Sequence, residues 1–250
     1  MDSIVEFLKQ TQGAVYTDET GKEKTLTLSP PFTEPELLAF EASLPCALPE
    51  DMRELLRFAS GLDGATSRLS DRFEIEEIRF ADITGFGLED VFPHGKELAV
   101  DGCGNSWVVD LTSESKVFAP IFFFCHDPPV VVYQTDSLLH LVQEVVRGNS
   151  PPWKSEIADV HERLATRIWQ ENPCAMSRSQ CLASGDHELK AFAESLDETW
   201  EFIDLRTPKV GDGYAWGRYG PKTANKRYGN KRIFACQKKT VGRRFLDAFR

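Results

Sequence analysis

The apolar positions of the first 148 residues change from helical to extended spacing along the chain. Apolar side chains recur every three or four residues over residues 2–12, 34–44 and 49–60, which predicts three helices. Between residues 73 and 133 they gather in short runs of β-branched and aromatic residues, which predict an antiparallel meander of strands. Residues 135–147 return to a helical stripe. Helices, then strands, then a helix predict an α+β fold with an antiparallel sheet flanked by helices.

The individual strands are expected to be short. Two lie in the lead-in, at residues 14–17 and 24–28, and six lie in the meander, at residues 73–75, 78–83, 98–101, 107–111, 121–125 and 130–133. Local signals mark two helix ends. Thr33 and Glu36 have the spacing of a capping box, and Gly61 is expected to end the helix over residues 49–60.

A polar stretch with two prolines at residues 148–153 predicts a linker. We therefore expect two domains, residues 1–148 and residues 149–250, the second being a smaller α+β C-terminal module. Its expected helices are residues 155–170, 186–196 and 241–249, and its expected strands are residues 200–205, 213–219 and 231–237.

The charge is divided unevenly along the 250 residues. The whole chain has a formal net charge of -10, yet residues 205–250 carry 13 cationic side chains against two aspartates, so that segment is +11 and the first 204 residues are -21. An asymmetry of this size bears on partners and association rates rather than on the fold.

Composition excludes several classes of protein. The longest apolar run, residues 119–125, is too short to cross a bilayer, and the acidic amphipathic start differs from a signal peptide, so a cytoplasmic protein is expected. The six cysteines lack the spacing of a zinc site or a disulfide framework. We expect no metal and no cofactor.

Two sequence motifs follow one another at a spacing of about fifty residues. The helix of residues 49–60 is entered through a proline and followed by a glycine, and about fifty residues later a strand, a Gly-Asn turn and a second strand carry Trp107. Together they resemble the SUKH superfamily, the fold of fungal cell-wall-assembly regulators and many bacterial immunity proteins, over residues 31–148. The resemblance implies a protein that binds other proteins and catalyses nothing. The leading hypothesis is an immunity protein that neutralises a cognate toxin by stoichiometric binding, and the alternative is a SUKH-type scaffold or regulator without a toxin.

The resemblance also implies a contact surface, because it places the turn of residues 102–107 beside the groove where the family meets partners. It implies partner contacts by four residues: Asp101, Asn105, Trp107 and Asp110. For Trp107 two readings stay open, a core residue or an interface anchor. The acidic stretch that contains Glu74 and Glu76 adds a solvated face that would attract a basic partner, such as a toxin domain.

The C-terminal cations are interleaved with aromatic residues, as in proteins that bind single-stranded nucleic acid. The candidate nucleic-acid or subunit contacts are Arg218, Lys222, Arg227, Lys231 and Arg232. No RNA-recognition consensus accompanies them. The alternatives are that this segment packs against the acidic body, pairs between the subunits of a homodimer, or contacts a partner protein. Both a monomer and a homodimer are compatible with the sequence.

No residues stand out as catalytic. Residues 125–127 read Cys-His-Asp, but neighbours along a strand point to opposite faces and cannot form a triad. No pair of carboxylates is singled out as an acid and base. We therefore expect that the protein is not an enzyme.

Overall fold

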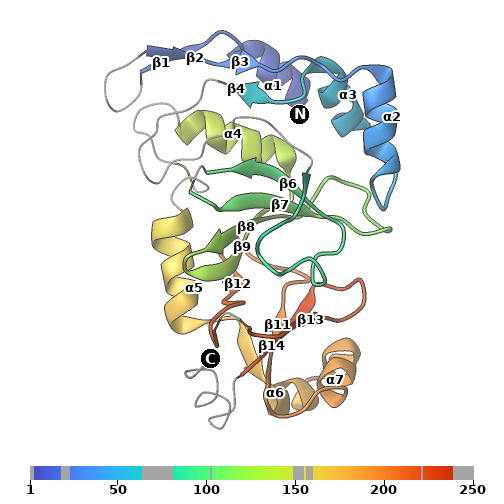
Figure 1. The fold of residues 1–250 in the computed structure, drawn as a ribbon, viewed down its shortest axis with the longest axis vertical. Coiled ribbons are helices and arrows are strands. Elements are labelled where there is room, and N and C mark those ends of the chain that lie inside the picture. The colour runs from blue at the N-terminus through green and yellow to red at the C-terminus, as the bar shows by residue number, and fades with distance from the viewer. Residues whose placement is uncertain are drawn as a thin grey trace.

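The computed structural model describes residues 3–17, 23–63, 81–101, 103–148, 155, 160–220 and 222–238. Over these residues the fold is α+β, as predicted. Figure 1 shows three levels along the long axis: the N-terminal helices at one end, a central sheet in the middle, and a second sheet with two helices at the other end.

The N-terminal level holds three helices and two small sheets. The helices are α1 (Ile4–Thr11), α2 (Glu34–Ala42) and α3 (Glu50–Phe58). The sheets pair β1 (Val15–Thr17) with β2 (Glu23–Thr25), and β3 (Thr27–Leu28) with β4 (Leu62–Asp63).

Local chemistry sets the ends of these helices. The predicted capping box of α2 is confirmed, since the Thr33 N–H donates to Glu36 Oε2 at 2.7 Å and the Glu36 N–H donates to Thr33 Oγ1 at 3.5 Å. The predicted role of Gly61 is wrong. Helix α3 ends at Phe58 because Ala59 already has extended backbone angles, and Gly61 does not adopt the left-handed conformation of a helix-ending glycine.

The central sheet has six strands, and every neighbouring pair is antiparallel. Five follow in chain order and confirm the meander: β5 (Ala81–Asp82), β6 (Gly95–Val100), β7 (Ser106–Asp110), β8 (Ile121–His126) and β9 (Pro129–Thr135). The sixth, β12 (Gly213–Tyr214), comes from the C-terminal segment and pairs with β9. The expected strand at residues 73–75 and residues 78–80 of the next lie outside the described residues.

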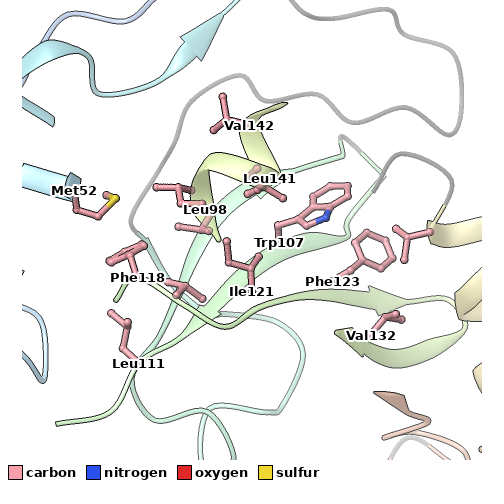
Figure 2. Packing of buried hydrophobic residues seen from close by; sticks show 14 of the residues in the cluster. Met52, Leu98, Trp107, Leu111, Phe118, Ile121, Phe123, Val132, Leu141 and Val142 are labelled. Atoms are coloured by element: carbon pink, nitrogen blue, oxygen red, sulfur yellow. The ribbon is translucent and has the colours of Figure 1, made fainter. Parts of the chain in front are cut away.

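Both faces of this sheet are covered. Trp107, Phe123 and Val132 face a core shared with α1, α3 and α4 (Leu138–Gly148), as Figure 2 shows for Trp107 beside Leu141. The alternate residues Val108 and Phe122 face a second core, shared with Ile203, Leu205, Tyr214 and Phe234 of the C-terminal segment. Double burial explains why β7 and β8 read as nearly continuous apolar runs rather than as alternating ones.

The chain then enters the C-terminal segment through a π-helical stretch, η1 (Val160–Ala165), which continues into α5 (Thr166–Glu171). A four-stranded antiparallel sheet follows, in the order β10 (Ala175–Ser177), β11 (Trp200–Asp204), β14 (Ile233–Gln237) and β13 (Asn225–Arg227). Helices α6 (Arg178–Ala183) and α7 (His187–Glu194) pack on it.

Two C-terminal expectations differ from the structure or lie beyond it, and some elements of this segment were not expected. Only residues 213–214 of the expected strand at 213–219 are extended, because the chain turns at residues 216–219. Helix α6 and strands β10 and β13 were not predicted. The expected helix at residues 241–249 lies outside the described residues.

The C-terminal segment is joined to the first 148 residues by a shared sheet as well as by a shared core. Strand β12 fits against β9 because position 213 is glycine: a Cβ there would lie 2.0 Å from the Val131 carbonyl oxygen. A domain boundary near residue 148 stays a prediction.

Candidate functional site: the junction of the two segments

Asp101 organises the turn between β6 and β7. Its Oδ1 accepts hydrogen bonds from the backbone N–H groups of Cys103, at 2.8 Å, and Asn105, at 3.0 Å, and its Oδ2 accepts one from Asn105 Nδ2 at 2.5 Å. Gly104 has a φ of +90°, which other residues rarely adopt. The carboxylate of Asp101 is therefore engaged in closing its own turn.

Asn105 extends this network to the end of β8. Its side chain is only 2% exposed, and its Oδ1 accepts the backbone N–H of His126 at 3.0 Å and lies 2.9 Å from His126 Nδ1. Among the residues of this edge that the structure describes, the exposed ones are Cys103, Gly104, His126 and Asp127. The structure places Asp101 and Asn105 together in this turn. Their polar atoms form hydrogen bonds within the turn and to His126.

Trp107 lies in the core, which decides between its two readings. It is 2% exposed, and its ring centroid is 4.8 Å from that of Phe123, below α4 (Figure 2). A side chain so deeply buried stabilises the domain and offers no area to a partner at the surface.

Asp110 is also buried, with no exposed surface, and it forms an ion pair with Arg227. Arg227 Nη1 donates to Asp110 Oδ1 at 2.8 Å, and Arg227 Nη2 donates to Asp110 Oδ2 at 3.0 Å. These two residues are 117 positions apart in the sequence. A predicted partner contact of the first segment and a predicted contact of the basic segment are thus bound to each other.

The remaining donors of Arg227 are satisfied as well. Nη1 also donates to the Val91 carbonyl at 3.1 Å, Nη2 to the Asn230 carbonyl at 3.2 Å, and Nε to the Lys231 carbonyl at 2.9 Å. The guanidinium carbon lies 5.8 Å and 5.6 Å from the ring centroids of Phe92 and Phe234. Full pairing offsets the cost of burying this charge.

The other predicted basic contacts are more dispersed. Arg218 donates to the carbonyls of Trp169 and, at 3.0 Å, Gln170, at the end of α5. Lys222 is exposed, and Lys231 Nζ lies 3.6 Å from Glu188 Oε1. Among the aromatic residues interleaved with these cations, Tyr214 and Phe234 are fully buried and stack on each other, with ring centroids 5.3 Å apart. These two rings are not accessible to nucleic-acid bases.

A cleft of about 740 Å³ lies where the two segments meet. One wall is formed by the loop between β7 and β8, residues 112–120, together with Tyr133 and Asp136. The opposite wall is formed by Glu188 and by the turns at residues 206–208 and 230–232, which include Arg232. Sequence reasoning did not find the cleft, because its walls are distant in the chain.

The cations of the cleft differ in their partners. Arg206 is held at 2.7–2.8 Å by Asp204, Asp186 and Glu188, and the hydrogen bond from Arg206 is the main reason that the pKa of Asp186 lies below its ordinary value. Arg232, by contrast, has a buried Nε with no hydrogen-bond partner among the residues that the structure describes.

Residues 31–144 match the SMI1 / KNR4 family (SUKH-1). This part of the chain is a SUKH domain. The family includes toxin immunity proteins. Searches of curated proteins and of solved structures each found no match to the chain. The SUKH domain thus spans α2 to the middle of α4, and it supplies one wall of the cleft and Asp110, whereas the opposite wall and Arg227 lie beyond the match.

The SUKH domain carries an acidic surface that the sequence reasoning did not single out. The sequence analysis singled out Glu74 and Glu76 instead, and these two residues lie outside the described residues. Helices α2 and α3 carry six carboxylates: Glu34, Glu36, Glu41, Glu50, Asp51 and Glu54. Glu41 pairs with Arg53 at 2.7 Å and Glu34 with Arg57 at 2.8 Å, which joins the two helices side by side. The high density of acidic residues between positions 34 and 54 was the sequence feature from which this surface could have been predicted.

This α2–α3 surface, which we define as the exposed side chains of Glu34, Glu36, Leu38, Glu50, Asp51 and Glu54, also has an apolar element. Leu37 is the buried residue of α2, and its neighbour Leu38 is 60% exposed. Glu34 and Leu38 are one helical turn apart and share a face. The surface therefore combines exposed carboxylates with one exposed apolar side chain.

Three of the cysteines, Cys125, Cys174 and Cys181, have the character of structural thiols. Burial raises the pKa of Cys125 to about 12, and it also raises the pKa of Cys174 and Cys181. These groups are therefore protonated thiols at neutral pH.

In the described part of the chain no three histidine, cysteine or acidic side chains are grouped as a metal site would require. Within the same residues, every helix is too short or too polar to span a membrane.

Proposed function

We propose that the chain is a non-catalytic binding protein whose SUKH domain captures a partner protein, and that the partner is a basic toxin which it neutralises as an immunity protein. The observation that carries the proposal is the α2–α3 surface of the SUKH domain, which combines five exposed carboxylates with the exposed Leu38. Helices α2 and α3 together carry six carboxylates and two arginines. An excess of one charge sign attracts a partner of the opposite sign, and an exposed apolar side chain contributes to the affinity after contact.

The charge distribution along the chain also favours attraction of a basic partner to the acidic first segment. The first 204 residues have a formal charge of -21, and most described cations of the following segment are engaged within the protein, as Arg206, Arg218 and Arg227 are. The acidic surface therefore stays available to a separate basic molecule. Such a field increases the association rate strongly at low ionic strength.

A direct test compares partner capture by the tagged full chain and by the variant Asp51→Asn/Glu54→Gln. Each protein is used to isolate partners from a lysate of its own host, with and without nuclease, and captured proteins are identified by mass spectrometry. We expect one stoichiometric basic protein that survives nuclease treatment and dissociates as salt is raised. The variant should capture it with a lower association rate and a smaller salt dependence.

The matched control is Glu171→Gln/Glu194→Gln, which removes two exposed carboxylates outside the SUKH match. It should capture the partner as the unmodified chain does. Co-expression of the captured protein then separates the candidate functions: a toxic partner whose toxicity this chain suppresses supports the immunity function, and a harmless partner supports the scaffold alternative. Nuclease-sensitive capture, or capture that the α2–α3 variant leaves unchanged, contradicts the proposed surface.

A further inference from the structure

The cleft at the junction is large enough to hold a ligand. Its volume of about 740 Å³ lies within the range of roughly 300–1,000 Å³ that small-molecule sites occupy. The SUKH domain provides Tyr133, Asp136 and the loop of residues 112–120, and the C-terminal segment provides the opposite wall. The cleft therefore exists only while both segments are docked, and it is separate from the α2–α3 surface.

Three arginines lie at this junction, and their pairing differs. Arg227 directs two of its nitrogens to the carboxylate of Asp110, and Arg206 is surrounded by three carboxylates. Arg232 lines the cleft without an ion pair to any residue that the structure describes, and its Nε is buried without an acceptor. The remaining, unburied nitrogens of its guanidinium form a fork that suits a two-oxygen anion.

The surroundings of Arg232 select the class of anion. Glu114 and Asp136 also line the cleft and would repel a phosphate dianion more strongly than a carboxylate, whereas Glu188 is paired with Arg206 and Lys231. Val117, which is 57% exposed, and Pro208 provide apolar wall on either side. We propose that the cleft binds a carboxylate carried by a peptide chain, with Arg232 as its anchor and the apolar wall receiving the neighbouring atoms.

The test follows the Nε–H signal of Arg232 by NMR in the full chain labelled with ¹⁵N. The signal is identified by its absence from the spectrum of Arg232→Lys. The probes are N-acetylglycinate, which presents a chain terminus, and the α-amide of N-acetylaspartic acid, which presents an acidic side chain. We expect a saturable shift of this signal with at least one probe, and the tighter probe identifies the source of the carboxylate. N-acetylglycinamide, which lacks the charge, should cause no such shift.

Two variants locate the binding. Arg232→Gln should weaken carboxylate binding roughly tenfold to a hundredfold, the loss expected for one charge-assisted pair. Lys222→Gln removes an exposed charge that does not line the cleft and should bind as the unmodified chain does. Binding is followed in both variants through the backbone amide signals of residues 231–233.

The proposal is overturned by an Nε–H signal that no carboxylate probe saturates, by an equal response to the neutral amide, or by unchanged affinity in Arg232→Gln. Tighter binding of inorganic phosphate than of either carboxylate overturns the assigned class. Since none of these measurements involves the α2–α3 surface, their failure and the failure of the proposed function are distinguishable.

Discussion

Replacing Arg227 with methionine tests how the C-terminal segment is held against the SUKH domain. The change keeps an unbranched side chain but removes five hydrogen bonds, of which two go to Asp110 and one goes to the Val91 carbonyl. Asp110 is fully buried, so the variant leaves an unpaired carboxylate in the interior. Breaking a buried pair in this way costs about 3–5 kcal/mol of the free energy of unfolding.

That loss is large against the whole stability of a typical folded chain, about 5–15 kcal/mol. In a protein of this size each kcal/mol shifts the midpoint of thermal unfolding by about 2–4 °C, so Arg227→Met should lower it by roughly 6–20 °C. The assay is urea and thermal unfolding followed by circular dichroism and tryptophan fluorescence. Lys222→Met is the matched control, because it removes an exposed cation and should stay within about 0.5 kcal/mol.

The double variant Asp110→Asn/Arg227→Met separates a specific pair from a general loss of packing. Once the buried carboxylate has been replaced, loss of Arg227 leaves no unpaired charge, so the double variant should be more stable than the sum of the single losses predicts, by roughly 1–3 kcal/mol. Additive losses, or a loss in Arg227→Met no larger than that of Lys222→Met, would refute the reasoning.

Three further outcomes are expected. Gly213→Ala should destabilise the fold by about 1–3 kcal/mol, measured by urea unfolding, because the new Cβ would meet the Val131 carbonyl oxygen that β12 approaches. Arg206→Gln should raise the pKa of Asp186 towards its ordinary value of 3.8, measured by NMR titration of the carboxyl group. A thiol reagent at neutral pH should modify exposed Cys103 quickly and buried Cys125, whose pKa is about 12, only on unfolding.

Each of these has its own check. Gly185→Ala places a Cβ in open space and should not destabilise the fold, so equal losses at both glycines would contradict the close-approach argument. Because the folded pKa of Asp186 lies below the unfolded one, its stabilisation is present above pH 3.8 and is lost as the pH falls through the lowered pKa; an unchanged pKa in Arg206→Gln would contradict the assigned cause. Cys103→Ser should abolish the fast thiol phase, and a fast phase that persists would contradict the assignment.

The sequence analysis located the turn of residues 101–107 but not the role of its side chains. Asp101 and Asn105 are polar residues in a turn, which suits both partner contact and local hydrogen bonding, and the structure shows the second. Contact with a partner by the turn itself stays a prediction. The basic segment shows the same ambiguity, since Arg227 and exposed Lys222 look alike in the sequence.

Local patterns by themselves determined most of the secondary structure and the family. The capping box at Thr33 and the strand meander depend on neighbouring residues, and the SUKH motifs are recognised by their order and spacing along the chain, so all three can be predicted from the sequence. Tertiary structure alone decided which side chains are accessible. Residues of the C-terminal segment cover the second face of the central sheet, which places Arg227 against Asp110, and they also form the opposite wall of the cleft. Exposure depends on which distant segment packs against a face, and no local pattern records that choice.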